Sequence, residues 1–276
     1  FRDAATMRAF TEQIAILHHL SIRVVLVHGG GPQLDEVTAK MGVQTRMVQG
    51  RRVTDAAAID ATSMVLNGLV NTRLLALCRE FGIAAIGLSG VDGGLVKAHR
   101  RAPVTLASGE VVDYGMVGDI DGVDGTVITR LLDAGFLPVV SPLSADAAGQ
   151  LLNINADTVA AAIGGALVAE KLILCTGAPG ILERLDDPHS LISYTDVAGL
   201  RRAHAIAPEL PDAGVLDWFT QKRRLQTGSD FLPLQFQQVV AIACALRDGG
   251  GFKIASVGTV EDAEPELIRR FFDLID

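Results

Sequence analysis

Apolar residues along the chain alternate between helical stripes and short uninterrupted runs. Residues 4–20 carry apolar side chains at helical spacing, and in residues 23–27 an arginine is followed by a continuous apolar run that predicts a buried strand. The alternation continues with predicted helices at 32–41, 56–81, 125–134 and 156–168 and predicted strands at 83–88, 136–140, 151–154 and 171–175. We therefore expect an α/β fold with an open, mostly parallel central sheet sandwiched by helices.

Two regions depart from this alternation. Residues 94–123 contain short alternating segments separated by Gly and Pro, which predict β-hairpins inserted on the α/β core. Beyond residue 195 the pattern weakens, and we expect helices near 196–203, 214–226, 234–247 and 265–275 and a strand at 252–257.

Composition and charge narrow the classes of function. The net charge is −8 and no basic stripe is present, which argues against a nucleic-acid partner. No apolar run reaches 18 residues, and no signal peptide is recognisable, so we expect neither a membrane span nor a membrane partner. Three cysteines without a CxxC spacing predict no protein-held metal and no disulfide framework. A cytoplasmic protein is therefore expected.

The first candidate site is the turn after the first predicted strand, His28-Gly29-Gly30-Gly31-Pro32. Glycines let the backbone approach a ligand, and the N-terminus of the following helix favours a phosphate or carboxylate. The alternative interpretation is a tight turn without a ligand.

Two further candidates also adjoin helix starts. Arg51 and Arg52 precede a predicted helix cap, where a guanidinium can clamp a carboxylate, and we expect only one of the two to point inward. An ordinary surface arginine is the alternative. Asn153 lies near the end of the extended segment at 151–154, and Asn155 and Asp157 follow it. We expect Asn155 to cap the next helix, whereas an amide at 153 and a carboxylate at 157 suit phosphoryl transfer.

A fourth candidate follows the strand at 171–175. The small residues from Thr176 to Leu182 let a nucleotide lie against the backbone, although a plain loop explains them equally well. The segment from Gly87 to Gly94 is similar, and we expect it to contribute to either of these sites.

Taken in order, these strings resemble the N-acetylglutamate kinases of the amino-acid-kinase family over roughly residues 1–200. The strings that carry the resemblance are His28 to Gln33, Gly50 to Asp55, Met64 to Asn71, Gly87 to Gly94, Gly115 to Gly118, Pro138 to Pro142 and Asn153 to Asp157. The resemblance implies the amino-acid-kinase fold, with residues 94–120 as a β-hairpin lid over the substrate. It implies one domain over 1–276, with an acylated amino acid bound by a lobe of about 1–150 and a nucleotide bound by a lobe of about 151–276.

The resemblance also implies an activity, the ATP-dependent phosphorylation of the side-chain carboxylate of N-acetyl-L-glutamate in arginine biosynthesis. Gly30 and Gly31 would bind the substrate through their N–H groups, and Arg52 would hold its α-carboxylate. Asn153 would contact the acetylated amino acid, and Asp157 would act as the catalytic residue that organises lysines. The expected ATP-binding residues are Gly177, Ala178, Pro179, Gly180, Ile181 and Leu182, with Mg²⁺ bound through the nucleotide.

Two family features differ in this chain. The family's opening Lys-x-Gly-Gly strand is not found after Phe1: we expect it to precede Phe1, and the alternative is that the protein lacks this lysine. Lys222 is the nearest candidate for the family's second lysine, in a segment that is atypical after about residue 200. The alternative function is therefore a non-catalytic domain that binds arginine or an acetylated amino acid, as in N-acetylglutamate synthase. A kinase for a related acyl amino acid, such as an aminoadipate derivative, is a third option. The family further implies a homo-oligomer, dimer or hexamer, and arginine as an inhibitor.

Overall fold

The computed structural model describes residues 3–43, 46–48, 51–106, 108–169, 171–176, 189, 194–196, 241–248 and 251–257. The chain divides into two compact units. The first contains Phe1–Val48 and Arg52–Val168, and the second contains Gln49–Arg51 and Ala169–Asp276.

The first unit contains helices and short strands in alternation. Its helices are α1 (Ala4–His19), α2 (Gly31–Met41), α3 (Ala56–Ser63), the π-helix η1 (Met64–Val70), α4 (Asn71–Glu80), the short 3-10 helix η2 (Asp92–Gly94), α5 (Thr126–Asp133) and α6 (Ala156–Ala166). Its strands are β1 (Leu26–Val27), β2 (Arg46–Val48), β3 (Arg51–Val53, which begins at the boundary), β4 (Ala85–Ser89), β5 (Val96–Arg100), β6 (Val104–Thr105), β7 (Val111–Val112), β8 (Gly118–Val123), β9 (Leu137–Ser141), β10 (Leu143–Ala145) and β11 (Leu151–Asn153).

The core of this unit is a parallel sheet with the order β1-β9-β4. Val27 pairs with Val140, and Ser89 pairs with Ser141, so the three strands end at the same edge. This confirms the parallel arrangement expected for the apolar runs at 23–27, 83–88 and 136–140, although β1 itself has only two residues. The shared edge is where an open α/β sheet places its ligands.

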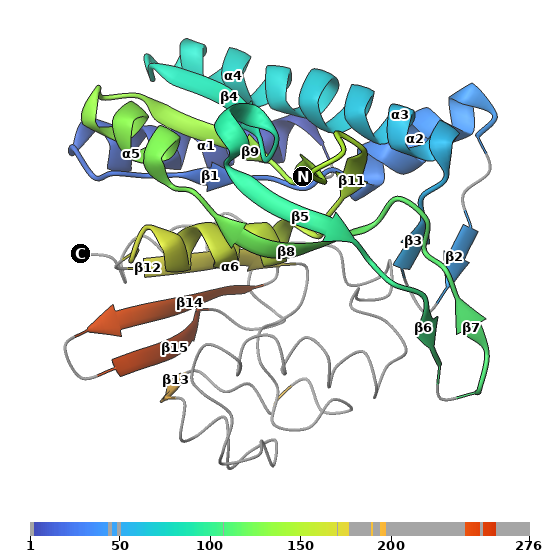
Figure 1. Ribbon diagram of the computed structural model, residues 1–276. Coiled ribbons are helices and arrows are strands. Elements are labelled where there is room, and N and C mark those ends of the chain that lie inside the picture. The colour runs from blue at the N-terminus through green and yellow to red at the C-terminus, as the bar shows by residue number, and fades with distance from the viewer. Residues whose placement is uncertain are drawn as a thin grey trace. The chain divides into compact units, whose positions relative to one another are not determined.

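Helices cover both faces of the sheet, with α4 on one side and α6 on the other (Figure 1). Val159 and Ile163 of α6 belong to a buried cluster with Val140, and all three side chains are almost fully excluded from solvent. On the α4 side, a Cβ added at Gly87 would lie 2.0 Å from the side-chain oxygen of Asn71. Helix α4 therefore packs directly on the backbone of β4.

The predicted helix over 56–81 is present but is not regular throughout. Asp55 caps α3 by accepting a hydrogen bond from the N–H of Ala58 at 2.8 Å. The π-helix from Met64 to Val70 then separates α3 from α4 and contains the pair Asn67-Gly68. π-helical turns are rare and concentrate at functional sites.

The predicted hairpins are confirmed. β5 pairs antiparallel with β8, and β6 pairs antiparallel with β7. β5 also joins β10 and β11 in a four-stranded sheet.

The described part of the second unit is a four-stranded sheet with the order β12-β14-β15-β13. Its strands are β12 (Lys171–Thr176), β13 (Tyr194–Asp196), β14 (Ala241–Asp248) and β15 (Gly251–Val257). Every pairing in it is antiparallel.

This sheet corrects two expectations. The strand at 171–175 exists, but it pairs with β14 instead of extending the parallel sheet. The helix expected over 234–247 is wrong for residues 241–247, which form a strand because pairing on both sides overrides the helix propensity of an Ala-rich segment. The helix expected near 196–203 starts on the last residue of β13, and the remaining residues of that range lie outside the described part. The helices expected at 214–226 and 265–275 also lie outside the described residues.

Candidate functional site

The glycine turn joins the end of β1 to the start of α2. Gly30 is the N-cap of α2, and Pro32 lies in the first turn of this helix, as the sequence predicts. Within the described part of the chain, the N–H groups of Gly30 and Gly31 donate to no backbone carbonyl outside regular elements. Two amides at a helix N-terminus are suited to bind an anion.

Packing explains why glycine is needed at one of these positions and not at the other. A Cβ added at Gly30 would lie 2.6 Å from Leu66 Cδ2 and 3.2 Å from Val70 Cγ2 in the π-helix. A Cβ added at Gly31 would meet nothing within 4 Å. The backbone at Gly30 is therefore held against the π-helix, whereas the space beside Gly31 is open.

A buried hydrogen-bond network supports the turn from below. The His28 ring is only 3% exposed, and its Nδ1 lies 2.9 Å from the carbonyl oxygen of Gly29. Its Nε2 lies 3.1 Å from Asn71 Nδ2, which also donates to the carbonyl of Val139 at 3.0 Å. Burial lowers the pKa of His28 below its usual value. The lowered pKa favours the uncharged form of the ring at neutral pH.

Arg52 lies on β3 with only 13% of its side chain exposed, so it points inward. Its guanidinium forms an ion pair with Asp35 of α2, whose side chain is 55% exposed. This pair attaches β3 to the helix that begins at the glycine turn. The side chain of Arg51 lies outside the described residues.

Asn153 ends β11, and its side-chain Nδ2 lies 3.4 Å from Thr54 Oγ1, two residues beyond Arg52. Its backbone N–H donates to Met116 at 2.9 Å, which fixes the strand end. Asn155 is the N-cap of α6, because its side chain accepts hydrogen bonds from the N–H groups of Asp157 at 2.8 Å and Thr158 at 3.2 Å. The predicted cap is confirmed.

Asp157 lies exposed in the first turn of α6, where the positive end of the helix dipole favours a carboxylate. A Cβ added at Gly29 would lie 3.6 Å from the Cβ of Ala156, so the glycine turn touches the start of α6. Three contacts therefore link the candidate residues. The glycine turn touches the start of α6, α2 pairs with Arg52, and Thr54, directly after β3, contacts Asn153. The predicted nucleotide residues from Gly177 to Leu182 lie outside the described residues.

Several residues of this region carry no signal that sequence reasoning could use alone. Only the folded chain places Asp35 and Thr54 against Arg52 and Asn153. Asn71 lies within the Met64 to Asn71 string, which only the family resemblance marks. Ser141, at the end of β9, donates to Asn67 of the π-helix and is fully buried.

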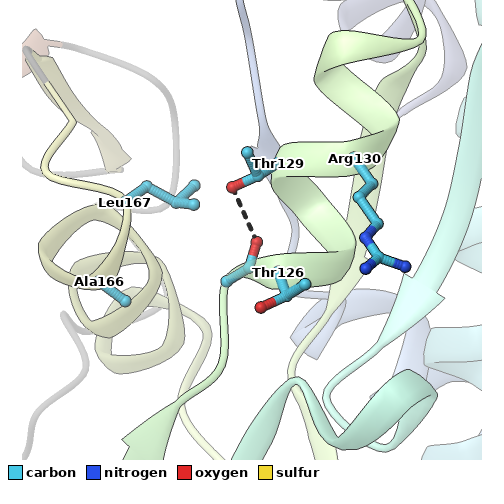
Figure 2. A pocket seen from close by; sticks show the side chains of 6 residues that line it. Thr126, Thr129, Arg130, Ala166 and Leu167 are labelled. Carbon is cyan, nitrogen blue, oxygen red and sulfur yellow. Dashed lines mark hydrogen bonds between the residues drawn. The ribbon is translucent and has the colours of Figure 1, made fainter.

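A shallow pocket lies away from this region, between the start of α5 and the end of α6 (Figure 2). It is lined by Gly125, Thr126, Thr129, Arg130, Ala166 and Leu167. The Thr129 hydroxyl already donates to the carbonyl of Gly125 at 3.0 Å. The pocket shares no residue with the candidates and lies at the opposite end of α6 from Asp157, roughly 15 Å along the helix at 1.5 Å per residue. We therefore place the site at the glycine turn and not at this pocket.

Within the described ranges, no group of three or more His, Cys, Asp or Glu side chains is arranged to hold a metal ion. Among the same residues, no helix has the length and apolar character needed to cross a bilayer.

Comparison with protein-family models gives two matches. Residues 1–209 match the model described as the amino acid kinase family. Residues 229–276 match a model described as a predicted 3'-5' exonuclease related to the exonuclease domain of PolB.

Relatives and solved structures were also compared. Residues of this chain are 47% identical over 213 positions to an acetylglutamate kinase of Myxococcus xanthus, covering 74% of this chain and 69% of the relative. They are 52% identical over 168 positions to an acetylglutamate kinase of Methanopyrus kandleri, covering 61% of this chain and 68% of the relative. A crystal structure of N-acetylglutamate synthase from Neisseria gonorrhoeae, complexed with coenzyme A and N-acetyl-glutamate, is similar with a TM-score of 0.60 at 24% identity. That likeness covers 82% of this chain and 50% of the synthase.

Proposed function

Because the chain belongs to the amino acid kinase family, we propose that it transfers the γ-phosphoryl group of ATP to the side-chain carboxylate of N-acetyl-L-glutamate. Membership confirms the resemblance seen in the sequence and the α/β fold expected from it. The observation that carries the proposal is the set of contacts that links two glycine amides, a largely buried arginine and an asparagine amide. The two relatives named acetylglutamate kinase, at 47% and 52% identity, support the choice of substrate.

The substrate has two carboxylates and an amide, and the site offers a group for each. Arg52 would hold the α-carboxylate, because a guanidinium that is 13% exposed gives charge-assisted hydrogen bonds with little competition from water. Asn153 would contact the acetylamino group through its side-chain amide. The N–H groups of Gly30 and Gly31 would face the reacting carboxylate and the phosphoryl group that it receives.

The reaction needs no proton transfer, because the reacting carboxylate is ionised at neutral pH. One of its oxygens forms a bond to the γ-phosphorus, the bond from that phosphorus to the β,γ-bridging oxygen breaks, and ADP leaves. Catalysis then rests on positioning and on stabilising negative charge, for which amides at a helix N-terminus are suited.

Asp157 is proposed to act as the catalytic residue by orienting the cationic groups that neutralise the phosphates. The nucleotide would lie along Gly177, Ala178, Pro179, Gly180, Ile181 and Leu182. ATP use follows from the kinase family, and Mg²⁺ would enter bound to the nucleotide.

The wider setting is proposed on the same basis. We propose one amino-acid-kinase domain over residues 1–276, a cytoplasmic homo-oligomer in arginine biosynthesis, and arginine as a feedback inhibitor. The second lobe would depart from the family pattern after about residue 200, and the match of residues 229–276 to a different family model falls within that segment.

The alternative is a non-catalytic domain that binds arginine or an acetylated amino acid. It has less support, because the likeness to N-acetylglutamate synthase is at 24% identity and shows the fold alone.

The decisive experiment incubates the purified full-length protein with ATP, Mg²⁺ and N-acetylglutamate and traps the acyl phosphate with hydroxylamine. We expect a hydroxamate that requires all three components, and an acetylated aminoadipate in place of N-acetylglutamate tests the third option. Calorimetric titration with N-acetylglutamate alone provides the second measurement. Binding without hydroxamate at high protein concentration would support the non-catalytic alternative, and absence of both would reject the substrate assignment.

A further inference from the structure

The hydrogen bonds beneath the glycine turn define a chain of contacts that ends at a substrate-facing amide. We propose that Asn71 is a positioning residue, which acts through the neutral His28 ring to aim the N–H of Gly30 at the reacting group. This inference rests on the proposed kinase function and adds to it a residue that touches no substrate.

The contacts begin at Asn71, which lies at the start of α4 and is 4% exposed. An asparagine amide has two N–H donors, and both have acceptors here. One donor reaches His28 Nε2 at 3.1 Å, and the other reaches the carbonyl of Val139 at 3.0 Å. Because Val139 lies on the central strand β9, the orientation of the amide is fixed by the sheet itself.

The second step is the tautomer of His28. Since Asn71 donates to Nε2, this nitrogen must be an acceptor, and the ring proton must lie on Nδ1. That proton points at the carbonyl oxygen of Gly29, 2.9 Å away. An imidazole with its proton on Nε2 would direct the Nδ1 lone pair at the carbonyl oxygen of Gly29 and the Nε2–H at the Asn71 amine, so neither contact would be a hydrogen bond. Asn71 therefore selects the tautomer that can hold the turn.

The third step is the geometry of the peptide bond. In a trans peptide unit the C=O of one residue and the N–H of the next point in opposite directions. Holding the Gly29 carbonyl toward the buried His28 ring therefore turns the Gly30 N–H away from the core. Leu66 and Val70 close off the side of Gly30 that faces the π-helix, which limits rotation of the same unit.

The shape-preserving test variant is Asn71→Asp. The new carboxylate can only accept, so we expect the His28 proton to move to Nε2 and the Gly29 carbonyl to lose its donor. Asn71→Ser is the second variant, since a hydroxyl can donate to one acceptor only and leaves a smaller side chain. The stability control is Leu74→Ala, which removes a fully buried side chain one turn further along α4 without altering the network.

Two measurements are made on the full-length protein. Long-range ¹H–¹⁵N spectra of histidine-labelled samples report the tautomer of His28. The signals of His28 are identified because they are absent from the spectrum of His28→Asn. Hydroxamate kinetics give kcat and KM for both substrates. We expect the Nδ1–H tautomer in the parent protein, its loss in Asn71→Asp, and a fall in kcat/KM for N-acetylglutamate of roughly 10- to 100-fold with the KM for ATP changed less than about twofold.

Three results would overturn the inference. The first is a proton on Nε2 of His28 in the parent protein, and the second is parent-like kinetics in Asn71→Asp after the tautomer has changed. The third is an equal kinetic loss in Leu74→Ala at matched thermal stability. If the parent protein forms no hydroxamate, the proposed function fails separately. The positioning inference is then decided by the tautomer and by the ¹⁵N shift of the Gly30 amide, which must change in Asn71→Asp and stay constant in Leu74→Ala.

Discussion

Alanine substitutions at the two adjacent glycines of the turn should have opposite effects on stability. In Gly30→Ala the added Cβ would lie 2.6 Å from Leu66 Cδ2, although carbon atoms normally approach to about 3.5–4.0 Å. Leu66 must therefore move by roughly 1 Å, and both Leu66 and its neighbour Val70 are buried. Overpacking of this kind costs about 1–3 kcal/mol, and we expect that loss in the free energy of unfolding.

Gly31→Ala is the matched control. Its Cβ would meet nothing within 4 Å, and Gly31 is the first residue of α2. Replacing glycine by alanine in a helix stabilises by about 0.5–1 kcal/mol, so we expect Gly31→Ala to be as stable as the parent protein or slightly more stable. Because its methyl group enters the open space proposed for substrate, the KM for N-acetylglutamate should still rise.

Urea unfolding at equilibrium measures both variants, and a double-mutant cycle tests the stated cause. If Leu66 is the obstacle, Leu66→Ala should cost less in the Gly30→Ala background than alone, with a coupling of about 0.5–3 kcal/mol. Equal urea midpoints for the two glycine variants, or strict additivity with Leu66→Ala, would refute the reasoning.

Three further predictions concern single residues. Burial lowers the pKa of His28 in the folded state, so the unfolded chain binds the proton more readily. The free energy of unfolding should therefore be highest above about pH 6.5 and should fall below that pH, by at most ~1.4 kcal/mol per pH unit. Urea unfolding at pH 5.5 and 7.5 should show this slope in the parent protein and a smaller one in His28→Gln. Burial raises the pKa of Cys78 to about 11, so iodoacetamide at pH 8 should leave it unlabelled until the protein is unfolded, as mass spectrometry can determine; rapid labelling of the native protein would contradict this. Asn155→Ala should lower stability by about 1 kcal/mol through loss of the α6 cap. Asp157→Asn removes a charge that the helix dipole favours, so it should lower stability by about 0.3–1 kcal/mol and lower kcat at least about 100-fold. A variant at 157 with parent-like kcat would remove that residue from the catalytic role.

The sequence predicts those parts of the fold that depend on neighbouring residues. Continuous apolar runs identify β4 and β9, and alternation broken by Gly and Pro identifies the hairpins between residues 96 and 123. The glycine turn is recognisable because strand, glycines, proline and helix follow each other directly.

Other parts depend on partners that are far away along the chain. β12 pairs with β14, about 70 residues later, and no local pattern indicates that the partner is antiparallel. Strands of three residues, such as β2 and β10, are shorter than the period needed to recognise them. In the site, the pairing of Arg52 with Asp35 and the two hydrogen bonds of the Asn71 amide become visible only when the strands are assembled.

The strand order of the central sheet has a consequence for synthesis on the ribosome. In the described sheet, β1 and β4 pair only through β9, which lies between them although it is the last of the three to be made. The 114 residues from His28 to Ser141 take roughly 6–23 s to translate at about 5–20 residues per second. During that interval β1, and later β4 once it has been made, remain without their shared partner, so the nascent chain carries unpaired apolar segments. The glycine turn therefore reaches its final geometry late in translation, because the backbone N–H of His28 bonds to Val140 of that last strand.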